Sequence, residues 1–143
     1  MDTQVADLLG GERVLGASIK SNLDLARATR QGLPAETAVQ LLEAIGLPAM
    51  GPLGGLIGSL RNATDRNASP ARLTPEQSDM VIRTASTLAK AIDVLGDREK
   101  AAHWLTAPNR ALGGEIPITL LDTSAGAHEV EALLDRIEYG VYS

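Results

Sequence analysis

The chain has 143 residues and a formal net charge of −5, which fit one domain or two very small ones and argue against an indiscriminate binder of polyanions. It contains no Cys, which excludes a disulfide scaffold and thiol chemistry, and no Phe, so Leu, Ile, Val and Ala must fill the core. Because a Leu- and Ala-rich sequence with few aromatic residues favours helix over sheet, the composition predicts an all-α fold.

The sequence shows no signal for a membrane. No apolar run approaches the roughly 20 residues that a spanning helix needs, and no signal-peptide pattern is found, so we expect a cytoplasmic protein without membrane contact. Charge is unevenly distributed: residues 51–93 hold five basic against four acidic residues, and residues 94–143 hold four against eight. The middle of the chain is therefore the better candidate for contacting phosphate, and the C-terminal part for contacting a basic cleft.

The N-terminal part predicts short helices that end at glycines. Residues 1–20 are weakly patterned, apart from one short amphipathic turn. A helix is expected over residues 22–31 and is closed by Gly32, since glycine tolerates the backbone conformation that ends many helices. Pro34 then suits the first position of a second helix. That helix has an apolar stripe at three- and four-residue steps, formed by Ala38, Leu41, Leu42 and Ile45.

Residues 47–72 are the least regular stretch, because two prolines and a group of glycines interrupt it. A glycine costs about 1 kcal/mol at a helix-interior position, so a helix here needs tertiary support. Two interpretations remain open. One is a glycine-rich connector between helices. The other is a helix-turn-helix with its turn at Gly58, whose second helix faces DNA with polar side chains. These side chains are Ser59, Arg61, Asn62, Thr64 and Arg66.

A long helix is predicted over residues 75–95. Thr74 and Gln77 match a capping box around Pro75, and apolar residues recur at three- and four-residue steps up to Gly96. The resulting apolar face serves either the core or dimerisation. Further helices are predicted over residues 98–106, over 117–121 and from 123 or 124 onward, with a turn around Pro108, Asn109, Arg110, Gly113 and Gly114 after the first of them.

No catalytic, cofactor or metal site can be assembled from the sequence. His103 and His128 lie far apart, and neither has a second His or a Cys nearby. Motifs for nucleotide binding or for an activated nucleophile are missing. Acidic pairs such as Glu129 and Glu131 suit a solvated helix face better than acid–base catalysis. We therefore expect a protein that is not an enzyme.

The C-terminal third carries a family resemblance. Residues 101–117, AAHWLTAPNRALGGEIP, resemble the alanine, Trp-Leu, Pro-Asn, Ala-Leu-Gly-Gly, Pro pattern of the Xre/MbcA/ParS toxin-binding domain. The resemblance continues in residues 120–123, in Gly126 and in the ending 136–143. These motifs are ordered and closely spaced, and they cover the chain from residue 97 onward.

Members of this family are antitoxins encoded beside RES-domain toxins, which consume NAD by degrading it or by transferring its ADP-ribose. The resemblance implies a toxin-binding domain over residues 97–143 that occludes the NAD pocket of the toxin. It also implies an Xre-like helix-turn-helix domain over residues 21–96, preceded by the weakly structured segment 1–20. Further implications are repression of the antitoxin's own operon through operator DNA, and a homodimer within a toxin–antitoxin hetero-oligomer.

The C-terminal tail is the predicted contact with the toxin. Two of the chain's three aromatic residues lie in its last five positions, and tyrosine is enriched at interface hot spots. An acidic tail with a free carboxylate also suits a cleft that holds the NAD pyrophosphate with basic side chains. Trp104, the third aromatic residue, is expected in the core. The predicted toxin-binding residues are Asn109, Arg110, Glu138, Tyr139, Gly140, Val141, Tyr142 and Ser143.

The segment predicted to contact DNA departs from the family pattern. Asp65 lies between Arg61 and Arg66, and glycine and proline lie upstream, whereas related antitoxins often carry several basic residues here. Operator binding is then either lost or dependent on the avidity of a multimeric complex. The alternative function is that of a stand-alone helix-turn-helix transcriptional regulator without a toxin partner.

Overall fold

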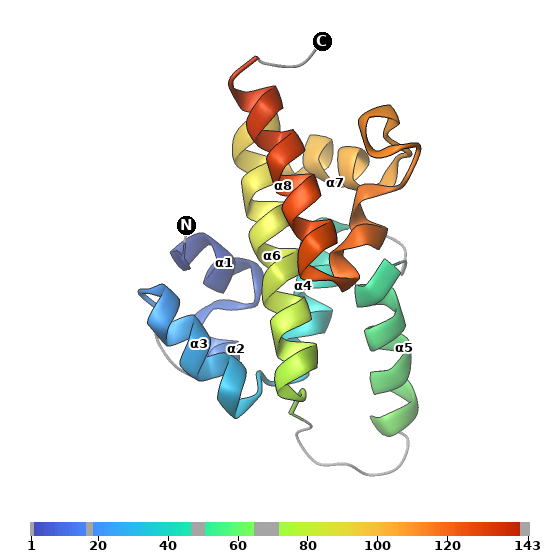
Figure 1. Ribbon diagram of the computed structural model, residues 1–143. Coiled ribbons are helices and arrows are strands. Elements are labelled where there is room, and N and C mark those ends of the chain that lie inside the picture. The colour runs from blue at the N-terminus through green and yellow to red at the C-terminus, as the bar shows by residue number, and fades with distance from the viewer. Residues whose placement is uncertain (1, 17–18, 47–50, 65–71, 141–143) are drawn as a thin grey trace.

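One long helix, α6 (Pro75–Leu95), runs through the centre of the molecule and contacts helices from both halves of the chain (Figure 1). The structure is a computed structural model that describes residues 2–16, 19–46, 51–64 and 72–140. Every named element in these ranges is a helix, which confirms the predicted all-α class. No helix in the described ranges is both long and apolar enough to span a membrane.

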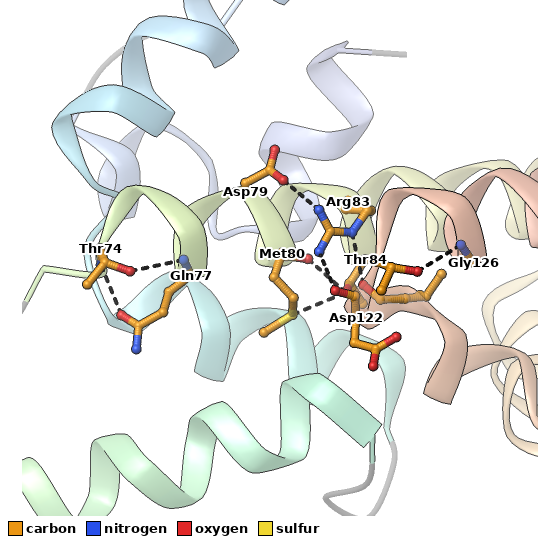
Figure 2. A network of polar contacts seen from close by, with 10 residues as sticks. Thr74, Gln77, Asp79, Met80, Arg83, Thr84, Asp122 and Gly126 are labelled. Carbon is orange, nitrogen blue, oxygen red and sulfur yellow. Dashed lines mark hydrogen bonds and ion pairs between the residues drawn. The ribbon is translucent and has the colours of Figure 1, made fainter.

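The start of α6 forms as predicted, because local side chains satisfy its first backbone N–H groups. Thr74 Oγ1 accepts a hydrogen bond from the Gln77 N–H at 3.1 Å, and Gln77 Oε1 accepts one from the Thr74 N–H at 2.9 Å (Figure 2). The predicted apolar stripe is buried at Val81, Ala85 and Leu88. This part of the stripe therefore belongs to the core.

The N-terminal segment is more regular than predicted. The helices α1 (Asp2–Leu8) and α2 (Gly11–Leu15) form where we expected one short amphipathic turn in a weakly structured segment. Val5, Leu8 and Leu9 are buried, and α1 packs on α6. The expectation is corrected for a physical reason: a few apolar residues suffice to order a short helix when they complete a core that another helix organises.

Two predicted helices are confirmed in the next segment, α3 (Asn22–Gln31) and α4 (Glu36–Ile45). α3 ends at Gly32, whose φ is +86°. α4 begins two residues after Pro34 rather than at it, since Pro34 takes part in an isolated antiparallel bridge with Arg72. This bridge ties the entry of α4 to the segment that leads into α6.

The helix α5 (Gly51–Thr64) corrects both interpretations of the glycine-rich stretch. The segment is neither a connector nor two helices with a turn at Gly58, but one unbroken helix. Leu53, Leu56 and Ile57 are buried, and α5 packs against α4 and α6. These contacts supply the tertiary support that a helix with interior glycines requires.

The C-terminal elements follow the predicted order. They are α7 (Arg98–Thr106), the 3₁₀ helices η1 (Arg110–Leu112) and η2 (Pro117–Asp122), and α8 (Ser124–Glu138). Asp97 caps α7 and Thr123 caps α8, since a side-chain oxygen of each accepts a hydrogen bond from a backbone N–H in the first turn of the helix. α8 lies along α6 and runs in the same direction (Figure 1), so the two helices end on the same side of the molecule.

A single hydrophobic cluster joins these helices. Its members include Val5 of α1, Leu41 of α4, Leu88 of α6, Leu105 of α7 and Leu134 of α8. Residues on both sides of position 96 thus share one core. The predicted domains, residues 21–96 and 97–143, therefore do not have separate hydrophobic cores.

Candidate functional site

A groove forms where the turn after α7 meets the C-terminal end of α8. We call it the α8 groove, and its volume is about 470 Å³. Its lining residues are Leu95, Trp104, Asn109, Arg110, Ala111, Leu133 and Ile137. Two of the predicted toxin-binding residues, Asn109 and Arg110, therefore share one surface with the end of α8. The sequence predicted the turn and the tail separately.

The turn after α7 is held by hydrogen bonds that converge on Asn109. Its side-chain oxygen accepts from the Ala111 N–H at 2.9 Å, its carbonyl oxygen accepts from the Gly114 N–H at 2.9 Å, and its own N–H donates to the Glu115 carbonyl at 3.0 Å. The φ values of +68° and +86° at the two consecutive glycines let the chain reverse here. Asn109 thus positions the turn, whereas the side chain of Arg110 is exposed.

Trp104 is half-buried, which corrects its expected place inside the core. It packs against the core and also lines a second groove of about 790 Å³, which we call the α7 groove. That groove is lined by Leu95, Asp97, Glu99, Lys100, His103, Trp104, Ala107, Pro108 and Asn109. Since Leu95, Trp104 and Asn109 line both grooves, the single Trp of the chain lies between two depressions with mainly apolar walls.

The end of α8 presents the first residues of the predicted tail. Glu138 is exposed, and Tyr139 is 73% exposed although large hydrophobic side chains are usually buried. Gly140 follows with a φ of +69°. The last three predicted residues, 141–143, lie outside the described ranges, and their contact with a toxin stays a prediction.

Polar contacts fix η2 and α8 on the surface of α6. Arg83 Nε donates to the Leu121 carbonyl at 2.9 Å, and Arg83 Nη2 donates to the Asp122 carbonyl at 3.3 Å (Figure 2). Nearer the end of α6, Lys90 Nζ lies 2.5 Å from Asp135 Oδ1. This hydrogen bond raises the pKa of Lys90, while partial burial acts against the shift and further carboxylates of α8 support it. The end of α8 therefore projects from a firmly held helix.

The residues predicted to contact DNA lie away from both grooves. Ser59, Arg61, Asn62 and Thr64 belong to the second half of α5, and Arg66 lies outside the described residues. α5 runs toward the side of the molecule where α6 begins (Figure 1). Both grooves are instead lined by Leu95, the last residue of α6. The structure therefore separates the two predicted sites.

Several groove residues were not predicted as site residues. Leu95, Leu133 and Ile137 fit the three- and four-residue spacing of an apolar helix face, which is correct for packing but hides their place in a groove. The sequence offers one signal for these groove residues, namely that Leu95 and Ile137 lie in the last turns of their helices. In the structure both side chains are only half-buried. Among the described residues, no group of three His, Cys, Asp or Glu side chains is arranged to hold a metal ion.

Comparison with protein families matches the part of the chain that builds this surface. Residues 90–140 match the family described as the antitoxin Xre/MbcA/ParS C-terminal toxin-binding domain. All lining residues of the α7 and α8 grooves lie within the matched range. So do the turn after α7 and the exposed end of α8.

Three relatives are similar to the chain beyond this region. "Antitoxin Xre" of Photorhabdus laumondii is 31% identical over 133 residues, which cover 92% of this chain and 89% of the relative. "Antitoxin Xre" of Yersinia enterocolitica is 35% identical over 105 residues, which cover 73% of this chain and 64% of the relative. "Antitoxin Xre" of Pseudomonas putida is 35% identical over 81 residues, or 57% of this chain and 51% of the relative. The match thus spans less than two thirds of the Yersinia and Pseudomonas relatives, and most of the Photorhabdus one.

Proposed function

This chain belongs to the Xre/MbcA/ParS antitoxin family, and on that premise we propose that it neutralises a RES-domain toxin by covering the toxin's NAD pocket. Residues 97–143 make the contact, and the chain itself performs no catalysis. The tail from Glu138 onward enters the pocket. Arg110 contacts the toxin beside it, and Asn109 holds the turn that carries Arg110.

The observation that carries this proposal is the exposed aromatic side chain at the end of a fixed helix. Tyr139 is 73% exposed, and an aromatic ring of this kind gains stability when a partner buries it. It directly follows α8, which the ion pair of Lys90 with Asp135 connects to α6, while Arg83 holds the preceding η2 on α6. A short segment that starts from a rigid base loses less conformational entropy on binding than a freely moving one.

The charge of the C-terminal part supports the same kind of partner. Residues 94–143 hold eight acidic residues against four basic ones. A pocket that binds the NAD pyrophosphate needs basic side chains or other hydrogen-bond donors. An acidic antitoxin surface is therefore complementary to such a pocket, and the attraction also speeds association.

Co-expression with the RES-domain protein encoded beside the gene tests this function. We expect the two proteins to copurify, and we expect NAD consumption to appear only when the antitoxin is removed. The measurement is an NAD-consumption assay on the purified complex before and after dissociation. A neighbouring protein that neither copurifies nor changes its activity contradicts the proposal and favours the stand-alone transcriptional regulator.

We propose operator binding as a second function, carried by the helix pair α4 and α5. The two helices are consecutive and pack on each other, as the two helices of a helix-turn-helix also do, and this supports the proposal. α5 then serves as the recognition helix, since Arg61 and Asn62 suit bidentate contacts with guanine and adenine. Because the chain has a net charge of −5, a homodimer or a toxin complex that binds two half-sites supplies the avidity.

A gel shift with the chain's own promoter, with and without toxin, tests operator binding. The double variant Arg61→Ala, Asn62→Ala is expected to bind at least about tenfold more weakly than the unmodified chain. Arg27→Ala on α3 removes one exposed positive charge elsewhere and serves as the control. The absence of a shift in both states contradicts the repressor role.

A further inference from the structure

We propose that the α7 and α8 grooves form a second contact with the toxin, which anchors it independently of the tail. In this contact, apolar side chains of one toxin segment lie on either side of the Trp104 indole. The inference rests on the proposed function and extends it. It separates two tasks: the grooves hold the toxin, and the tail blocks its active site.

The grooves have the composition of the centre of a protein interface. Leu95 provides an aliphatic wall beside Trp104 in both grooves, and Leu133 and Ile137 extend it in the α8 groove. Apolar atoms make up most of the exposed lining of each groove, although the α7 groove also has charged side chains. Trp is among the residues most enriched at binding hot spots. The indole is half-buried and already packs against the core, so little side-chain entropy remains to be lost on binding.

Position and charge favour the toxin over a second copy of this chain as the occupant. Both grooves lie within residues 90–140, the range that matches the toxin-binding domain, and they adjoin the turn that presents Arg110. A toxin that receives the tail is thus already next to them. The eight acidic against four basic residues of 94–143 also favour a basic surface of another protein at these grooves over the same acidic surface of a second copy.

The charged lining residues give the bound segment a direction. In the lining of the α7 groove the two carboxylates Asp97 and Glu99 outnumber the single Lys100, whereas the charged lining residue of the α8 groove is Arg110. A toxin segment that crosses both grooves therefore places a basic side chain at the α7 end and an acidic one at the α8 end. Its apolar residues lie between these two charges, over Trp104.

The tail is not part of the anchor. Neither Tyr139 nor Gly140 lines either groove. Removal of the tail therefore leaves both grooves intact, and the complex is expected to persist after inhibition is lost. If the tail made the whole contact with the toxin, its removal would instead abolish binding and inhibition together.

Ala111→Arg tests the anchor without disturbing the core. Ala111 is exposed and lines the α8 groove, so the longer side chain occupies the groove from its solvent side. Titration calorimetry with the purified RES-domain toxin is expected to show about 30-fold weaker binding, the loss typical of one hot spot. Ala26→Arg makes the same change on the exposed surface of α3 and is expected to bind like the unmodified chain.

The outcomes distinguish this inference from the function on which it rests. Weaker binding by Ala111→Arg, together with retained binding by the chain that lacks the tail, supports the anchor. If the unmodified chain and Ala111→Arg bind the toxin equally tightly, the anchor is overturned and the proposed function stands. If the unmodified chain does not bind the toxin, the proposed function fails and the anchor with it. If Ala111→Arg changes the self-association of the chain but not its affinity for the toxin, the grooves bind a second copy, and the inference is overturned as well.

Discussion

Removal of residues 139–143 is expected to release the NAD-consuming activity of the toxin without unfolding the antitoxin. Tyr139 lies beyond the last helical residue and is mostly exposed, so its side chain contributes little to the core. Each tyrosine at an interface hot spot contributes about 2 kcal/mol, and the loss of two therefore weakens inhibition by roughly 1000-fold. The measurement is the NAD-consumption assay at increasing antitoxin concentration.

Leu23→Ala is the control for this deletion. Leu23 is also a large exposed apolar residue, at 58%, but it belongs to α3 and lies outside both grooves. We expect it to leave inhibition unchanged. Circular dichroism of the truncated chain should give the helical spectrum and melting temperature of the full chain. Undiminished protection by the truncated chain contradicts the role of the tail.

Gly126→Ala is expected to destabilise the fold by about 3 kcal/mol, the upper part of the usual range for overpacking. Gly126 lies in the first turn of α8, and a Cβ atom added there collides with the Leu120 carbonyl oxygen of η2. The backbone of η2 cannot move freely, since Arg83 is hydrogen-bonded to its last carbonyls. Thermal denaturation should show a decrease in Tm of roughly 10 °C.

Gly58→Ala provides a matched control with the opposite sign. Gly58 is also a helical glycine, in α5, but a Cβ atom added there meets nothing within 4 Å. Alanine is favoured over glycine in a helix interior, so the stability is expected to rise by up to about 1 kcal/mol. If both glycine variants lower Tm by similar amounts, the close approach of α8 and η2 is not the cause of the effect at Gly126.

Local chemistry in the sequence determined most of the helix boundaries. Thr74 and Gln77 form the predicted cap of α6, and Asp97 at α7 and Thr123 at α8 form caps of the same local kind. A cap depends on side chains within four residues of the N–H groups that it satisfies, so the sequence alone contains the necessary information. The short motifs near the C-terminus located the toxin-binding domain for a similar reason, because they are contiguous.

Only the tertiary structure decided the course of α5 and the composition of the grooves. The glycines left open a connector and a helix-turn-helix with its turn at Gly58, but the burial of Leu56 and Ile57 against other helices outweighs the cost of about 1 kcal/mol per glycine. The half-buried position of Trp104 depends on how α8 lies beside the turn after α7. That placement follows from contacts such as Lys90 with Asp135, which join residues far apart in the chain and which no local pattern encodes.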